Sequence, residues 1–258
     1  MSEMETLFKC AAVLATFTLM GACSSGEEVD TSVQCTADGA VVHRFDTSDG
    51  VTLEADFVSS GTTNSPVVVL LHMIPPHHDR TGYPSDFIDA LHTKGFDVLN
   101  LDRRGAGASD GVAEEAYTGD GGRLDVEAAV QFLQSHACQS DLARLVVVGA
   151  SNGTTSALDY TVGTEEPRPA ALVFLTGGSY TENQNKLAEN TSLLSSKPML
   201  FVFSTEERAW SAAFNVEGVS PNWRFDEYGV GDHGTKMFAA APESVARTAE
   251  WMQSALTP

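Results

Sequence analysis

Residues 145–155 read LVVVGASNGTT, an apolar run that passes through a Gly-x-Ser-x-Gly pentapeptide into a helical pattern. A continuous run of mostly β-branched residues is typical of a strand buried on both faces of a parallel sheet. A sharp turn from such a strand into a helix would hold Ser151 above the sheet in a strained backbone conformation. Larger side chains two positions away would collide there, so the turn needs Gly149 and Gly153. The stretch therefore predicts Ser151 as a candidate nucleophile.

Similar apolar runs recur on both sides of this turn, at 67–71, 96–101, 171–175 and 199–203, with a weaker one at 223–228. Two further strands, 41–45 and 51–57, are joined by a hairpin-type turn at 47–50. Helical spacing of apolar residues lies between the runs, at about 84–94, 121–137, 153–163, 183–194 and 240–256. The alternation predicts an α/β fold with a doubly wound, mostly parallel central sheet flanked by helices. Residues 176–198 are too few for a large cap domain.

The composition limits the classes of function. The 258 residues include 35 acidic and 15 basic side chains, a formal net charge of −20. Nucleic-acid binding needs clustered Lys and Arg, which this chain lacks, so that class is excluded. The same deficit argues against electrostatic binding to an anionic lipid surface. With 42% hydrophobic residues, the composition is that of a globular protein. The length suits one large α/β domain or two small ones, with enough chain to bury a core.

The N-terminus has the pattern of a targeting segment. Residues 10–22 read CAAVLATFTLMGA, an apolar run shorter than the roughly 20 residues that span a bilayer. The run fits the apolar region of a secretory signal. Its end, residues 20–23, resembles a bacterial lipobox, which implies removal of 1–22, lipidation of Cys23, a polar tether over 23–39 and a domain at 40–258. We expect an envelope protein anchored through its N-terminal lipid, on either membrane, or a secreted protein if a plain signal peptide is cleaved instead.

The remaining cysteines and the histidines give no sign of a metal or cofactor. There is no CxxC pair, which argues against a zinc ribbon. Cys35 and Cys138 could form a disulfide in an oxidising compartment or stay separate thiols. The cluster at 77–79, His-His-Asp, has no matching distant ligand, so we expect no metal site.

With its serine turn between a strand and a helix, the chain resembles the α/β-hydrolase fold superfamily over about residues 40–256. The resemblance is closest to compact, capless esterases and dienelactone-hydrolase-like members. In that superfamily the nucleophile is followed along the chain by an acid and then a histidine. His233 is the only histidine after Ser151, and it lies in a glycine-flanked loop before the last helix. It is therefore the candidate base, since a serine hydroxyl needs a base near neutral pH to take its proton.

The acid is expected after the run at 199–203, where members of the superfamily more often carry aspartate. Glu207 occupies the matching place here, directly beside Glu206. Asp226 and Asp232 are further alternatives for the group that would orient His233.

The resemblance also implies an oxyanion hole made of two backbone N–H groups. Asn152, directly after the candidate nucleophile, would supply one. The other would come from the loop after 67–71, which often begins His-Gly in the superfamily. Here glycine is replaced by Met73, so Ile74 would donate by register, with Met73 as the alternative.

A second landmark, DRRGAGAS at 102–109, resembles the D-x-R-G-x-G-x-S turn of the superfamily. We expect it to brace the loops beside the pocket, with Arg104 bonded to backbone carbonyls or to Asp102. A phosphate-binding glycine loop is the rival interpretation, but the spacing and the missing Lys-Ser/Thr argue against it.

These patterns predict a serine hydrolase that cleaves small carboxylic esters or lactones. An amidase or peptidase of the same fold is the alternative within enzymes, because fold does not fix substrate. A different class is a lipoprotein that binds a ligand or partner without turnover. An intact hydrogen bond between Ser151 and His233, with an acid behind His233, would argue against that class.

Overall fold

The computed structural model describes residues 35–37, 39–136, 138–164, 167–178, 185–211 and 218–257. The predicted signal peptide, Cys23 and most of the predicted tether lie outside these residues.

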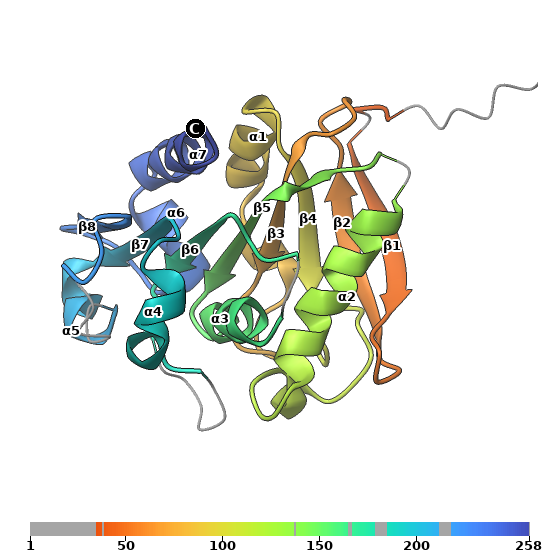
Figure 1. Ribbon diagram of the computed structural model, residues 1–258, viewed down its shortest axis with the longest axis horizontal. Coiled ribbons are helices and arrows are strands. Elements are labelled where there is room, and N and C mark those ends of the chain that lie inside the picture. Colours follow the sequence, from red (N-terminus) through yellow and green to blue (C-terminus); the bar gives the residue numbers. More distant parts are fainter. Residues whose placement is uncertain are drawn as a thin grey trace, which may run out of the picture. The chain divides into compact units, whose positions relative to one another are not determined.

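One eight-stranded sheet, in the order β1-β2-β4-β3-β5-β6-β7-β8, forms the centre of the described domain (Figure 1). Its strands are β1 (Ala40–Asp46), β2 (Thr52–Val58), β3 (Pro66–Leu71), β4 (Asp97–Asp102), β5 (Asp141–Ala150), β6 (Ala171–Leu175), β7 (Met199–Ser204) and β8 (Trp223–Tyr228). The pairs β1–β2 and β2–β4 are antiparallel, and every pair from β4 to β8 is parallel. The prediction of a mostly parallel, doubly wound sheet is confirmed.

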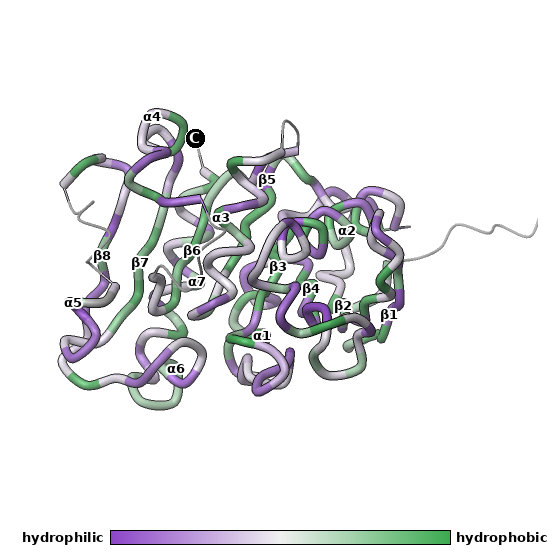
Figure 2. Tube along the Cα trace, turned by 90° about the horizontal axis from the view of Figure 1, so that it is seen from below, coloured by the Kyte–Doolittle hydropathy of each residue, from purple (hydrophilic) through white to green (hydrophobic). Residues whose placement is uncertain are grey.

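Helices cover both faces of this sheet. On one face lie α1 (Ser85–Thr93) and α7 (Glu243–Ala255), and on the other lie α2 (Gly121–Ser135) and α3 (Gly153–Gly163) (Figure 1). Along β3, Val67 and Val69 pack into one core cluster while Val68 and Leu70 pack into the other. Figure 2 shows the hydrophobic character of the central strands β5 and β6. Burial on two faces is the reason these strands are continuous apolar runs.

The shorter elements are α4 (Thr191–Leu194), α5 (Arg208–Ser211) and α6 (Met237–Ala240). The 3-10 segments are η1 (Arg80–Gly82), η2 (Ala113–Ala116), η3 (Leu187–Asn190), η4 (Thr205–Glu207) and η6 (Gly234–Lys236). In the described part of the chain, nothing the size of a cap domain joins β6 to β7. No described helix has both the length and the apolar character that a membrane crossing requires.

Two helix predictions need correction. Over the described part of 183–194, the chain forms only η3 and α4. The Asn190 amide donates to the Lys186 carbonyl at 2.8 Å, and such side-chain bonds compete with a regular helix. The last helix begins at Glu243 instead of 240, because Pro242 stands at its start and separates it from α6.

Cys35 and Cys138 are free thiols in this structure, not a disulfide. Cys138 is buried, and Cys35 packs against the same core cluster. Burial and the neighbouring Cys138 thiol raise the pKa of Cys35 to about 11. The structure therefore matches the two-thiol alternative.

Candidate active site

Ser151 stands on a strained turn between β5 and α3. Its φ is 50°, a left-handed value that is uncommon for any residue but glycine. The Ser151 N–H donates to the Leu175 carbonyl at 2.8 Å, which ties the turn to the end of β6. Its side chain thus lies at the carboxyl ends of neighbouring strands.

The two glycines of the turn have no room for a side chain. A Cβ on Gly149 would lie 2.6 Å from the Gly153 carbonyl oxygen. A Cβ on Gly153 would lie 2.4 Å from the Leu71 carbonyl oxygen at the end of β3. Close approach of β3, β5 and α3 therefore requires glycine at both positions.

The structure brings together the three side chains that the sequence singled out. Ser151 Oγ lies 2.6 Å from His233 Nε2, and His233 Nδ1 lies 2.6 Å from Glu207 Oε1. Glu207 ends η4, directly after β7, and His233 lies in the loop between β8 and η6. The Glu207 and His233 side chains are 22% and 37% exposed. This geometry suits an imidazole that accepts the serine proton while a carboxylate fixes its orientation.

Among the described residues, none of the alternative acids makes a hydrogen bond or ion pair with the His233 ring. Glu206 is exposed beside Glu207. Asp226 pairs with Arg224 at 2.6 Å on β8. Asp232 accepts the backbone N–H of His233 at 2.6 Å.

Thr176, which was not predicted from the sequence, connects Glu207 to the histidine loop, the segment 229–234 that carries His233. Its hydroxyl donates to Glu207 Oε2 at 2.8 Å and accepts the Gly234 N–H at 3.0 Å. Like Ser151, it has a φ of 50°, which is rare for a β-branched residue. A polar residue directly after the buried run at 171–175 was the available signal.

The loop predicted to complete the oxyanion hole follows β3. The N–H groups of Met73, Ile74 and Asn152 have no hydrogen-bond acceptor among the described residues. The Met73 side chain is buried and packs against Gly234 in the histidine loop. The packing is so close that a Cβ added to Gly234 would lie 2.5 Å from the Met73 sulfur. Met73 therefore packs against the loop of the candidate base.

His72 fixes the backbone of this loop as a neutral side chain. Its Nδ1 donates to the Met73 carbonyl at 2.7 Å, and its Nε2 accepts the Arg103 N–H at 3.0 Å. Complete burial, with the Arg103 charge nearby, lowers the pKa of His72 to about 3. The neutral ring can therefore accept the Arg103 N–H at any pH near neutrality.

The expected role of Arg104 is wrong. Its guanidinium pairs with Asp125 at 2.7 Å and with Asp49 at 2.8 Å, so it faces α2 and the β1–β2 hairpin. Asp102 pairs instead with Arg80. The neighbouring Arg103 makes the bonds to loop carbonyls, because successive side chains point to opposite sides of the extended segment.

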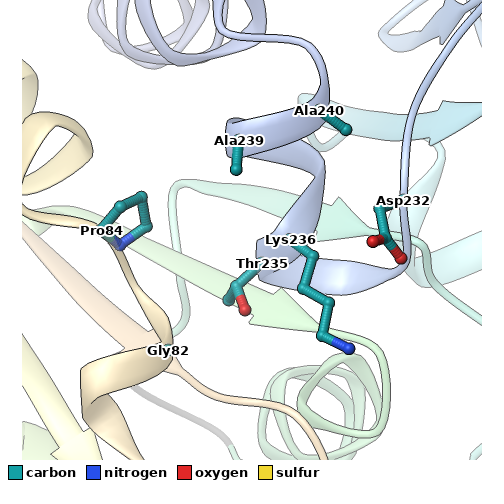
Figure 3. A pocket seen from close by; sticks show the side chains of 7 residues that line it. All are labelled: Gly82, Pro84, Asp232, Thr235, Lys236, Ala239 and Ala240. Carbon is teal, nitrogen blue, oxygen red and sulfur yellow. The ribbon is translucent and has the colours of Figure 1, made fainter.

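A cavity of about 510 Å³ lies beside the histidine loop (Figure 3). It lies between the segment that carries Gly82 and Pro84 and the segment that carries Thr235 and Lys236. Its lining includes Asp232 but none of the side chains of Ser151, His233 and Glu207. Among the described residues, no group of three or more His, Cys, Asp or Glu side chains is placed to hold a metal ion.

A protein-family model described as serine aminopeptidase, S33 (Hydrolase_4) matches residues 63–206, more than half of the chain. The chain belongs to this family. The matched region includes Ser151 and ends one residue before Glu207. A search of curated proteins finds no match for the chain.

The fold is also that of solved hydrolases. An esterase from Pyrococcus furiosus superposes with a TM-score of 0.64 at 20% identity, over 83% of this chain and 90% of that one. An esterase from Rhodococcus sp. gives 0.64 at 13% identity, over 84% and 99%. A dienelactone hydrolase from Anabaena variabilis gives 0.63 at 16% identity, over 85% and 99%. At these identities the likeness establishes the α/β-hydrolase fold, as the resemblance implied.

Proposed function

We propose that the protein is a serine hydrolase that cleaves small carboxylic esters or lactones through an acyl-enzyme. The observation that carries this proposal is the chain of two 2.6 Å contacts from Ser151 through His233 to Glu207. Ser151 stands on a strained strand-to-helix turn, which is the backbone setting of such a nucleophile at the end of a strand.

In the proposed reaction, His233 Nε2 takes the Ser151 proton as Oγ attacks the carbonyl carbon. The imidazolium then gives this proton to the leaving alkoxide, which departs as an alcohol. Water, deprotonated by His233 in turn, then attacks the acyl carbon. The bond to Ser151 Oγ breaks, Oγ takes the proton back from the His233 imidazolium, and the carboxylic acid is released. Glu207 holds the imidazole by its Nδ1–H and stabilises the imidazolium that forms in both steps.

The proposed oxyanion hole comprises the Asn152 N–H and an N–H from Ile74 or Met73. Free N–H groups directed at the developing charge stabilise the tetrahedral intermediate. The N-terminus of α3, an 11-residue helix, adds the positive end of its dipole beneath Ser151.

Esters are favoured over amides because the structurally similar proteins reported above include esterases and a dienelactone hydrolase. The family description favours a second candidate, an aminopeptidase. The intact Ser151–His233 contact argues against a binding protein without turnover.

The test is a panel of p-nitrophenyl esters, from acetate to octanoate, beside aminoacyl p-nitroanilides. We expect the full chain to hydrolyse short esters, and Ser151→Ala to lower kcat/KM by about 10⁴-fold or more. A folded protein without ester turnover, or an unaffected Ser151→Ala variant, would refute the proposal. Serine-dependent turnover of anilides alone would favour the aminopeptidase.

We also propose that Cys23 is the lipidated N-terminus of the mature protein. The support is the lipobox-like sequence at 20–23. Bacterial cells expressing the full chain should incorporate an alkyne-tagged fatty acid into it, and Cys23→Ser should abolish incorporation. Equal labelling of both would contradict lipidation at this residue.

A further inference from the structure

Arg103 is a completely buried cation in the turn after β4. Its side chain is 0% exposed. Within the described part of the chain, no carboxylate lies within ion-pair distance of it, whereas its neighbour Arg104 pairs with Asp125 and Asp49. Burial lowers the pKa of Arg103 to about 10, which still leaves the guanidinium charged at neutral pH.

An unpaired buried charge is expensive. Desolvation of an ion in a protein interior costs several kcal/mol, and a partner charge normally offsets part of this. Hydrogen bonds to neutral oxygens, together with the buried Asp125 carboxylate beyond ion-pair distance, compensate Arg103 only in part. Its Nε has no partner among the described residues. A methionine of similar volume would fill the space at lower cost. A buried charge at this position therefore points to a function outside folding.

The neutral partners of Arg103 lie on both halves of the predicted oxyanion hole. Nη1 donates to Asn152 Oδ1 at 2.9 Å, to the His72 carbonyl at 3.3 Å and to the Met73 carbonyl at 3.4 Å. The Arg103 backbone N–H donates to His72, which in turn holds Met73. One residue thus connects the loop after β3 to the residue that follows the nucleophile.

Two further bonds fix the guanidinium from its other side. Nη2 donates to the Ala116 carbonyl at 2.7 Å and to Ser156 Oγ at 2.9 Å. Ser156 lies on α3, so the cation is clamped between η2, α3 and the loop after β3. The guanidinium is therefore held in position before the substrate binds, and it cannot reorient when the substrate or solvent moves.

We propose that Arg103 is a positioning residue of the oxyanion hole. It holds the Asn152 and Met73–Ile74 amides in place and keeps a buried positive charge behind the carbonyl oxygen that becomes negative. The inference rests on the proposed hydrolase function. A fixed charge in a dry interior acts over a longer range than in water, because little solvent screens it.

The test compares Arg103→Lys, which keeps the charge, with Arg103→Gln, which keeps hydrogen-bond donors without it. We expect Arg103→Gln to lower kcat for ester hydrolysis by roughly 10- to 100-fold, less than the loss of a direct donor, with KM changed by less than about threefold. Affinity for a trifluoromethyl ketone, which forms an anionic tetrahedral adduct with serine, should fall by a similar factor. Arg103→Lys should keep most of both.

A pH profile separates charge from packing. A buried lysine has a lowered pKa, so kcat of Arg103→Lys should fall as pH rises through that pKa, while the wild-type profile stays flat there. Ser156→Ala removes one bond of Arg103 and leaves the charge. We therefore expect it to lower kcat by less than Arg103→Gln does, without a change in the shape of the pH profile.

Equal losses in Arg103→Lys and Arg103→Gln at all pH values would overturn the inference, since packing alone would then explain them. Wild-type kcat in a folded Arg103→Gln variant would do the same. If Arg103→Gln does not fold, the inference is tested by the pH profile of kcat in Arg103→Lys and by the affinity of that variant for the trifluoromethyl ketone. A wild-type protein that turns over no ester would instead refute the underlying function, so the two failures are distinguishable.

Discussion

Neighbouring residues of the same type have different surroundings in this site. Glu207 contacts the imidazole of His233, while Glu206 is exposed. Arg103 contacts the loop after β3, while Arg104 pairs with carboxylates on the opposite side. In each pair the two residues are of the same type and adjacent in the chain, and they differ only in their contacts. Comparing variants of the two residues therefore isolates the effect of those contacts.

The first residue-scale prediction uses the glutamate pair. Glu207→Gln keeps the size of the side chain but removes the charge that stabilises the imidazolium, so we expect kcat to fall by about 10²- to 10⁴-fold. Glu206→Gln, the matched control, should stay within about twofold because that side chain is exposed. Steady-state ester hydrolysis measures both, and equal effects would contradict the assignment of the acid.

The second residue-scale prediction concerns His72 and pH. Its pKa is about 3 in the folded protein and near 6.5 when unfolded, so the unfolded chain binds the extra proton between these values. Stability from the neutral ring is complete above about pH 6.5 and decreases as pH falls toward 3, by up to about 1.4 kcal/mol per unit. At pH 5 the free energy of unfolding is therefore lower by about 2 kcal/mol than it is above pH 6.5, from this group alone.

Urea unfolding of wild type and His72→Gln at several pH values measures this contribution. The free energy of unfolding should depend less steeply on pH in the variant between pH 4 and about 6.5. All other side chains are the same in the two proteins, so their contributions cancel in the difference. Identical slopes would show that His72 is not buried as a neutral group.

At the scale of elements, the sheet was predictable and the loop contacts were not. The runs at 67–71 and 171–175 agree with β3 and β6 to within a residue, because burial on two faces leaves a continuous apolar signal. Helix starts and the segment 183–194 were less accurate, since caps and competing side-chain bonds decide them. Loop contacts such as those of Thr176 and Arg103 join residues far apart in the chain, and no local pattern encodes them.

The candidate triad was easier to predict than its supports. Chain order and strand context pointed to Ser151 and His233, because the geometry of a parallel sheet brings its strand ends to one edge. The role of Arg104 was wrong because register decides which of two adjacent arginines faces the loop after β3. Charge and spacing are the same for either choice.

An element-scale prediction tests the close approach at the nucleophile turn. Gly149→Ala would place a methyl group 2.6 Å from backbone atoms at the start of α3. We expect a loss of about 3 kcal/mol or more in unfolding free energy, or failure to fold. Gly229→Ala is the matched control, because nothing lies within 4 Å of its added Cβ. Urea unfolding that finds equal losses would contradict the packing described for the turn.

At the scale of the whole molecule, the acidic excess is the dominant property. Thirty-five acidic side chains against 15 basic ones repel one another at neutral pH and oppose the compact state. Raising NaCl from about 10 mM to 500 mM should screen this repulsion and raise Tm by a few degrees. A fall in Tm across the same range would mean that ion pairs, such as those of Arg80, outweigh the repulsion.

The central claim is that Ser151 is an activated nucleophile, and covalent labelling with a fluorophosphonate probe tests it most directly. The full chain should be labelled at Ser151, as located by peptide mass spectrometry, and both Ser151→Ala and His233→Ala should lose the label. Circular dichroism of each protein confirms that it is folded. A folded wild-type protein that takes up no probe, or labelling that persists in Ser151→Ala, would contradict the claim.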